Sequence, residues 1–150
     1  MKRVYILRGL PGMGKSTIAK LLAAEAAGDV YEQDAVVTIC SADEYFVKDG
    51  VYQWFRQGVH TAHVRCQDKF LQALNRDAGI VNVVWPNVVI VDNTNVKHSD
   101  YKFYVEEAKT HGFEVFVLAV GTLDVETSYA RNKHGVPRET IQAMANRWQP

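Results

Sequence analysis

The residues best suited to chemistry form a glycine-rich run, Gly-Leu-Pro-Gly-Met-Gly-Lys-Ser, at positions 9–16. Its spacing matches G-x-x-x-x-G-K-[ST], the pattern in which backbone N–H groups surround the phosphates of a nucleoside triphosphate. Glycines permit the turns that aim these groups inward, and a following helix adds the positive end of its dipole. The run therefore predicts an ATP site. The residues expected to contact the nucleotide are Gly9, Leu10, Pro11, Gly12, Met13, Gly14, Lys15, Ser16 and Thr17.

Three side chains of this loop have separate predicted roles. Lys15 reaches the β- and γ-phosphates as a point charge, Ser16 offers its hydroxyl to Mg²⁺, and Thr17 contacts the α-phosphate. The alternative is a chance glycine-rich turn, but a predicted strand before the loop and a predicted helix after it argue against that. The motif alone does not separate a kinase from an ATPase or a GTPase.

Two carboxylates follow other predicted strands. Asp43 comes just after Val36–Cys40 and could accept the proton of an attacking hydroxyl or help to hold Mg²⁺ through water. The structural alternative is that it begins a short helix, and its neighbour Glu44 is expected to be solvated. Asp92 ends the apolar strand 88–91, the position of a Walker B-type carboxylate. We expect Asp92 to orient Mg²⁺ or to bond to Ser16, so these two residues are the predicted metal site.

Two segments could contact the acceptor of a phosphoryl group. The polar run after Asp92 is either a turn or a substrate-reading loop, and from it we predict contacts by Thr94 and Asn95. The aromatic stretch 45–56 has no helical period and could stack on a nucleobase or pack against the core. Its predicted substrate contacts are Tyr45, Trp54 and Arg56.

A basic segment near the C-terminus could close over the nucleotide. Arg131 lies near the end of a predicted helix and is followed by Asn-Lys-His-Gly. An arginine in a lid would stabilise charge on the transferred phosphoryl group. An exposed cation favoured by the helix dipole is the alternative. We assign Arg131 to catalysis with Lys15 and Asp43.

The elements that must position these residues alternate between strand and helix. The predicted strands are Lys2–Arg8, Val36–Cys40, 88–91 and 114–120, and the apolar, β-rich stretch 80–85 is assigned to neither state. The predicted helices are Lys15–Ala27, 59–77, 99–111, 123–133 and a last one with Pro137 in its first turn and Trp148 at its end. This alternation predicts an α/β fold of the P-loop NTPase type, a three-layer sandwich with a mostly parallel sheet and helices on both faces. We expect one domain, 1–150. Ligands of such sheets bind beyond the carboxyl ends of the strands, where all the candidate sites fall.

Composition limits the partners. Basic and acidic residues number 17 each, whereas proteins that grip long nucleic acids carry a basic excess, so such contact would be confined to a few phosphates. Hydrophobic residues make up 47%, enough for one core. Cys40 and Cys66 lack metal-ligand spacing and indicate reduced thiols. The first apolar run is too short to span a membrane, so we expect a cytoplasmic protein with no membrane contact.

Four segments together resemble the polynucleotide-kinase-like group of P-loop kinases. The group includes bacteriophage 5′-polynucleotide kinases, Nedd4-binding-protein-like ATP-binding domains and the more distant zeta-toxin-like kinases. The matching segments are 9–17, 41–46 (Ser-Ala-Asp-Glu-Tyr-Phe), 91–95 (Val-Asp-Asn-Thr-Asn) and 130–137 (Ala-Arg-Asn-Lys-His-Gly-Val-Pro).

The resemblance implies that Asp43 is the general base on the acceptor hydroxyl and that Arg131 belongs to the lid. This sequence departs from the pattern of the group at Phe46, which stands where the phage 5′-kinases carry an arginine aimed at the acceptor's phosphate. Related phage kinases act on a hydroxymethyl group of a modified DNA base, which is a further acceptor that the resemblance implies.

The leading hypothesis is an ATP- and Mg²⁺-dependent kinase acting on a nucleic-acid hydroxyl, DNA more than RNA. The hydroxyl is a 5′-end or the hydroxymethyl group of a base such as hydroxymethyluracil. The alternatives are a kinase for a nucleoside, sugar or antibiotic, and an ATP-binding switch module. Lys15, Ser16, Asp43 and Arg131 argue against the module, because pure binding has no need of a base.

Overall fold

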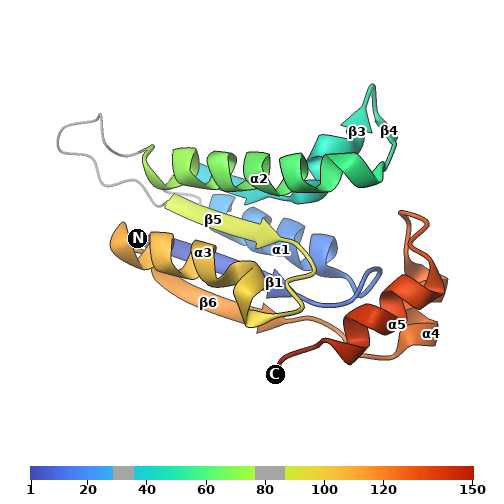
Figure 1. Ribbon diagram of the computed structural model, residues 1–150. Coiled ribbons are helices and arrows are strands. Elements are labelled where there is room, and N and C mark those ends of the chain that lie inside the picture. The colour runs from blue at the N-terminus through green and yellow to red at the C-terminus, as the bar shows by residue number, and fades with distance from the viewer. Residues whose placement is uncertain (29–35, 77–86) are drawn as a thin grey trace.

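A four-stranded parallel sheet organises the protein (Figure 1). The computed structural model describes residues 1–28, 36–76 and 87–150, so the β-rich stretch 80–85 lies outside the described residues. The strands are β1 (Lys2–Arg8), β2 (Val36–Cys40), β5 (Asn87–Asp92) and β6 (Glu114–Ala119), in the order β2-β5-β1-β6. All pairings are parallel, and Leu7 lies opposite Asp92. The predicted parallel sheet is therefore confirmed.

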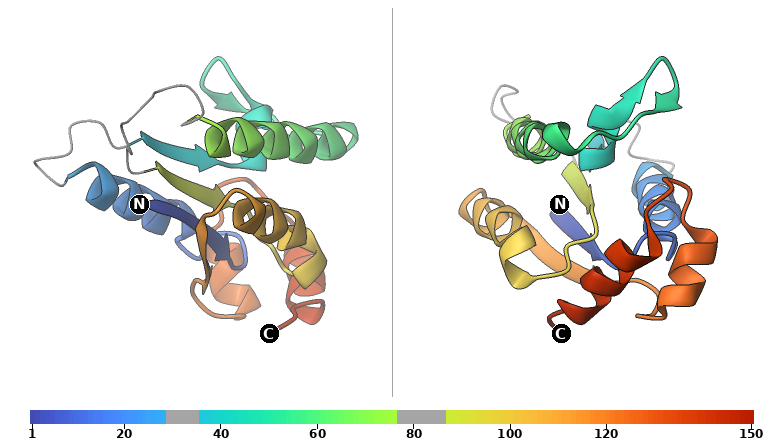
Figure 2. Two further views of the ribbon diagram at one scale, coloured as in Figure 1. Left: turned by 90° about the vertical axis from the view of Figure 1, so that its left-hand side faces the viewer. Right: turned by 45° about the vertical axis from the view of Figure 1, so that its right-hand side comes forward.

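Helices cover both faces of this sheet, as predicted (Figure 2). α1 (Lys15–Ala27) covers one face, and α2 (Val59–Leu74) and α3 (His98–Thr110) cover the other. α4 (Val125–Arg131) and α5 (Arg138–Asn146) pack together beside the loop that follows β1.

Side chains alternate between the two faces along the strands, which divides the core in two. In β5, Val89 and Val91 pack toward α2 and α3, whereas Val88 and Ile90 pack toward α1. All six residues of β5 are buried, because the strand is covered on both faces and flanked by β1 and β2. This explains why it is the most apolar strand in the sequence.

Capping residues account for the small differences from the predicted helix limits. α2 ends at Leu74 instead of extending to 77, with Asn75 at its C-cap. α3 begins one residue early because the Asp100 carboxylate accepts from the Lys97 N–H at 2.9 Å, and it ends before Gly112, as predicted. The helix predicted over 123–133 is shorter, since Asp124 caps its start by accepting from the Glu126 N–H and the backbone is extended at Asn132.

The last helix begins one residue later than predicted. Pro137 is its N-cap in extended conformation, not a residue of its first turn, and the helix ends at Asn146, before Trp148.

The aromatic stretch after β2 folds into short elements. They are the 3₁₀ turn η1 (Ala42–Phe46), the antiparallel strands β3 (Val47–Lys48) and β4 (Val51–Tyr52), and the 3₁₀ turn η2 (Arg56–Gly58). Phe46 is only 5% exposed and packs against Tyr52 and Phe55. Phe46 is thus buried, whereas Trp54 and Phe55, which follow β4, are exposed.

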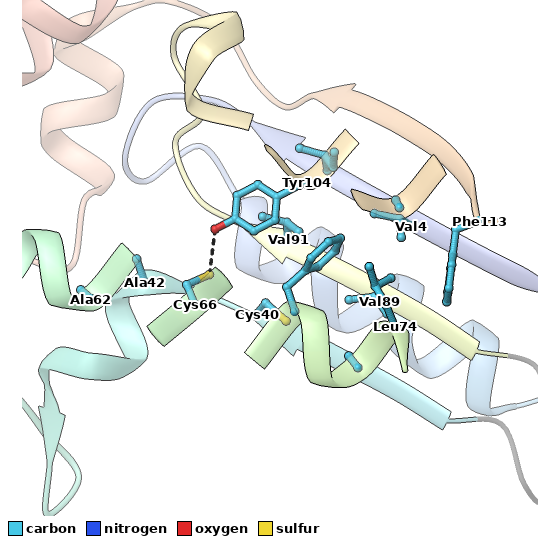
Figure 3. Packing of buried hydrophobic residues seen from close by; sticks show 14 of the residues in the cluster. Val4, Cys40, Ala42, Ala62, Cys66, Leu74, Val89, Val91, Tyr104 and Phe113 are labelled. Carbon is cyan, nitrogen blue, oxygen red and sulfur yellow. Dashed lines mark hydrogen bonds between the residues drawn. The ribbon is translucent and has the colours of Figure 1, made fainter. Parts of the chain in front are cut away.

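The core between the sheet and helices α2 and α3 contains both cysteines, which are free thiols (Figure 3). The Tyr104 hydroxyl donates to the Cys66 sulfur at 3.3 Å. Burial raises the pKa of Cys40 to about 12 and also raises the pKa of Cys66, so both thiols stay protonated at neutral pH. Within residues 1–28, 36–76 and 87–150, no helix is both long and apolar enough to cross a membrane.

Replacement of Phe70 by alanine tests this core. The side chain is fully buried and meets the Tyr104 ring edge to face at 5.0 Å. We expect Phe70→Ala to lower the free energy of unfolding by about 3–5 kcal/mol, because the cavity is too enclosed to collapse. Leu21→Ala is the control, since Leu21 is 61% exposed on α1. Urea unfolding followed by circular dichroism measures both, and equal losses would contradict the assignment of this core.

Candidate active site

The loop between β1 and α1 adopts the backbone that its glycines predict. Gly12 and Gly14 have φ angles of 71° and 91°, in the left-handed region that disfavours a side chain. Gly14 is the N-cap of α1, so the loop leads directly into the first N–H groups of that helix. These free N–H groups and the helix dipole make the end of α1 an anion site.

Hydrogen bonds from elements distant in sequence hold the loop. The Gly9 N–H donates to the carbonyl oxygen of Thr94 at 3.0 Å. The hydroxyl of Ser128, a fully buried residue of α4, donates to the Pro11 carbonyl oxygen at 2.6 Å. The loop is therefore braced by the segment after β5 on one side and by α4 on the other.

The apolar residues of the loop face the protein interior. Leu10 is fully buried and Met13 is 8% exposed, and they pack in one cluster with Val125 of α4 and Ile141 of α5. Their side chains are therefore not available to a nucleotide, and any contact that they make comes from the backbone.

Gly12 lies against the end of α4 with no room for a side chain. A Cβ atom at this position would be 2.6 Å from the Asn132 nitrogen and 2.7 Å from the carbonyl carbon of Arg131. The structure thus brings the predicted lid arginine next to the phosphate loop, and the Arg131 side chain is exposed there.

Lys15 is buried within the loop, at 9% exposure. Its ammonium donates to the carbonyl oxygens of Gly9 and Leu10 at 3.0 and 2.9 Å. Burial lowers its pKa, whereas the negative charges of Asp92 and Asp43 act in the opposite direction. Both predicted carboxylates are thus electrostatically coupled to the same ammonium.

The predicted bond between Ser16 and Asp92 is present. The Ser16 hydroxyl donates to a carboxylate oxygen of Asp92 at 2.7 Å. A hydroxyl and a carboxylate oxygen at the carboxyl end of a parallel sheet are the hard ligands that suit Mg²⁺. The residues present therefore fit a magnesium ion.

Asp43 presents an exposed carboxylate from the turn η1. Its own N–H is capped by the Ser41 hydroxyl at 3.3 Å, so Ser41 and not Asp43 caps this turn. The Tyr52 hydroxyl donates to one oxygen of Asp43 at 3.2 Å, and Nε2 of His134 lies 3.7 Å from the other. Burial and the Asp43 charge raise the pKa of Tyr52, which stays a neutral donor.

The residues predicted to contact the acceptor lie in different environments. Trp54 is 56% exposed on the segment after β4, and Arg56 is exposed on η2. Tyr45 is half-buried and lies against the guanidinium of Arg65. The Thr94 carbonyl braces the phosphate loop.

Asn95 does not occupy the predicted position in a substrate-reading loop. It is 3% exposed, and its side-chain amide donates to the Leu7 carbonyl oxygen at 2.8 Å. Its φ of 45° is left-handed, which asparagine tolerates. Because its amide is used inside the fold, the structure corrects the predicted acceptor contact to a supporting role for the segment after β5.

Sequence reasoning missed Arg8, which ends β1 and is 5% exposed. Its guanidinium donates to the carbonyl oxygens of Asn95 and Val96 at 2.9 and 3.0 Å. The same group lies between the rings of Tyr101 and Trp148, at 4.9 and 4.3 Å from their centroids. The position of this charged residue at the end of an apolar strand could have predicted a buried guanidinium with hydrogen-bond partners, since a buried charge requires them.

Comparisons with known proteins agree with this geometry. Residues 4–150 match the family model described as AAA domain, AAA_33. The chain is 30% identical over 149 residues to human NEDD4-binding protein 2, a match that covers 97% of this chain but 8% of that protein.

Solved structures with low sequence identity have the same fold. Chaetomium thermophilum Kti12 in complex with ADP-AlF3 has a TM-score of 0.62 at 18% identity and aligns over 98% of this chain and 80% of its own. A gluconokinase from Sinorhizobium meliloti 1021 has a TM-score of 0.54 at 14% identity, over 99% and 76%.

Fold and site together define a P-loop domain of the nucleotide-kinase-like class, and nucleotide binding follows from that class. The chain belongs to the AAA domain family AAA_33, and it is homologous to the matching segment of NEDD4-binding protein 2.

Gly12→Ala tests the contact between the phosphate loop and α4. We expect nucleotide binding to weaken by about 10-fold or more, because overpacking costs about 1–3 kcal/mol and here displaces the loop. Gly112→Ala is the matched control, because Gly112 has a φ of 76° and nothing lies within 4 Å of an added Cβ. Gly112 comes before the amino end of β6, at the edge of the sheet opposite the phosphate loop. Both variants share the left-handed strain, and calorimetric titration with ATP separates them. Equal affinities would show that the close approach at Gly12 has no role in binding.

Proposed function

We propose that the protein is an ATP-dependent kinase that transfers the γ-phosphoryl group to a hydroxyl of a nucleic-acid substrate. One observation carries the proposal: the Ser16–Asp92 bond and the Asn93–Ala42 bond bring the turn that bears Asp43 to the same edge of the sheet as the phosphate loop. A carboxylate on the acceptor side of a phosphate loop supplies a base, which nucleotide binding alone does not require.

The transfer uses groups that the structure brings together. Asp43 accepts the proton of the acceptor hydroxyl. The hydroxyl oxygen then bonds to the γ-phosphorus, and the bond between that phosphorus and the leaving oxygen of ADP breaks. Lys15 and the loop N–H groups stabilise the charge on the phosphate oxygens. Arg131, next to Gly12, adds a cation from the lid side. Tyr52 and His134 hold the Asp43 carboxylate from two sides.

The metal proposed here is Mg²⁺, held by the Ser16 hydroxyl and the Asp92 carboxylate. When bound, it neutralises charge on the β- and γ-phosphates.

The segment that follows the β3–β4 hairpin supports a nucleic-acid acceptor. Trp54 and Phe55 are 56% and 46% exposed, next to the exposed cation Arg56. Exposed aromatic rings beside arginine favour stacking on bases, which is tolerant of sequence. The formal net charge of zero is consistent with a contact limited to this rim. A 5′-hydroxyl end and a hydroxymethyl group of a modified DNA base are the acceptors to test.

Asp43→Asn tests the base. We expect phosphoryl transfer to fall by about 10²–10⁴-fold, because the amide cannot take the proton, while ATP affinity stays near normal. Asp49→Asn is the matched control, since Asp49 lies in the β3–β4 turn with a left-handed φ that asparagine also accepts.

Radiolabelled ATP measures the transfer to 5′-hydroxyl oligonucleotides, to hydroxymethyluracil DNA, and to nucleosides and sugars. Label on nucleosides or sugars alone would show that the acceptor is a small molecule and not a nucleic acid. Undiminished transfer by Asp43→Asn would show that Asp43 is not the general base.

Asp92→Asn tests the metal site. Asparagine retains an oxygen that can accept from Ser16 but loses the charge. We expect the affinity for ATP to fall by about 10-fold with Mg²⁺ present and to change little in EDTA, because metal ligation depends on that charge. Titration with a fluorescent ATP analogue in both buffers measures the difference. Equal losses in the two buffers would mean that Asp92 supports the fold and not the ion.

A further inference from the structure

A polar pocket lies next to Asp43, between η1, β3 and α2. Its volume is about 350 Å³, within the range of small-molecule sites. Figure 1 shows the β3–β4 hairpin beside the N-terminal end of α2. The residues that line the pocket are Ser41, Glu44, Tyr45, Val47, Ala62, Arg65, Cys66 and Lys69.

The wall of this pocket is joined to the candidate active site. The Ser41 hydroxyl, which lines the pocket, accepts from the N–H of Asp43. Asn93 follows Asp92 directly, and its side chain accepts from the Ala42 N–H at 2.9 Å and donates to the Cys66 sulfur at 3.6 Å. A group in the pocket would thus lie on the same turn as the proposed base.

One cation of the pocket is left without a carboxylate. The Lys69 ammonium donates to the two carboxylate oxygens of Glu44, at 2.9 and 2.7 Å. Among the described residues, no carboxylate forms an ion pair with Arg65, whose guanidinium lies 5.2 Å from the centroid of the Tyr45 ring.

The contact with the Tyr45 ring limits where the Arg65 guanidinium can lie. It leaves the N–H groups of the guanidinium for hydrogen bonds. Two parallel N–H donors match two oxygens of a phosphate, which lysine cannot reproduce. Arg65, an exposed residue, therefore offers a guanidinium fork to a pocket where Glu44 and Lys69 form an ion pair with each other.

We propose that this pocket binds a phosphate group of the acceptor, with Arg65 as its principal ligand. The inference rests on the proposed kinase function and deepens it, because it names the acceptor as a hydroxyl compound that already carries a phosphate. A phosphodiester of a nucleic-acid chain and a nucleotide monophosphate share this chemistry. A neutral sugar or nucleoside does not.

Four acceptors with the same 5′-hydroxyl test the proposal. They are the dinucleotide TpT, its uncharged methylphosphonate analogue, thymidine 3′-monophosphate and thymidine. We expect the wild-type protein to show a lower KM for the two charged acceptors than for the two neutral ones. Arg65→Gln raises the KM of the charged acceptors by about 10- to 100-fold, the usual weight of a charged hydrogen bond, and changes their kcat little.

Two further variants separate binding from folding. Arg65→Lys keeps the charge without the fork and gives a partial increase in KM for the charged acceptors. Arg147→Gln removes an equal charge from the exposed residue after α5 and leaves every KM unchanged. If Arg65→Gln acted equally on charged and neutral acceptors, the proposed phosphate site would be overturned. A lower KM for TpT than for thymidine 3′-monophosphate would indicate that the site binds a phosphodiester of a nucleic-acid chain. A lower KM for thymidine 3′-monophosphate would indicate that it binds a nucleotide monophosphate.

A binding measurement keeps this inference distinct from the kinase proposal. Fluorescence anisotropy with a labelled single-stranded oligonucleotide compares the wild-type protein with Arg65→Gln. Binding that depends on Arg65 without transfer to any acceptor would support the phosphate site and reject the kinase function. Equal binding by both proteins would reject the phosphate site.

Discussion

The placement of β5 between β2 and β1 is the constraint on which the site depends. The strand is buried along all six residues, so it can only lie at the centre of the sheet, covered by helices on both faces. In parallel register Leu7 lies opposite Asp92 and Cys40 lies opposite Val91, which brings the carboxyl ends of three strands to one edge. The phosphate loop, η1 and the segment after Asp92 therefore leave the sheet side by side. Two bonds, Ser16 to Asp92 and Gly9 to Thr94, then join the first loop to the third.

Beyond this edge, the phosphate loop and the α4–α5 pair share one apolar cluster. Leu10 and Met13 belong to the loop, yet they pack with Val125 and Ile141, and Ser128 bonds to the backbone of the loop. A shift of α4 would therefore displace the loop backbone that would hold the phosphates, because close-packed interiors transmit displacement. The segment after α4 also reaches the acceptor side, where His134 lies against Tyr52 and Asp43.

Two cations of the site have carboxylate counterparts. Lys15 is balanced by Asp92 and Asp43, and Lys69 by Glu44. Among the described residues, Arg131 and Arg65 form no ion pair with a carboxylate; one lies beside the phosphate loop and the other lines the pocket beyond Asp43. Cations in these two places suit a reaction in which one phosphate is transferred and a second one positions the acceptor.

The sequence by itself determined the features that depend on neighbouring residues. The phosphate loop, the buried strand before Asp92 and the limits of α1 could be predicted because glycine spacing, apolar runs and helical period are local properties. The remaining features join residues far apart in the chain. Ser128 reaches Pro11 across 117 positions, Arg8 binds Asn95 and Trp148, and Arg65 stacks on Tyr45. Only the tertiary structure decided these contacts, because they exist once strand order and helix packing bring the partners together, and no local pattern specifies which distant side chain will meet a given one.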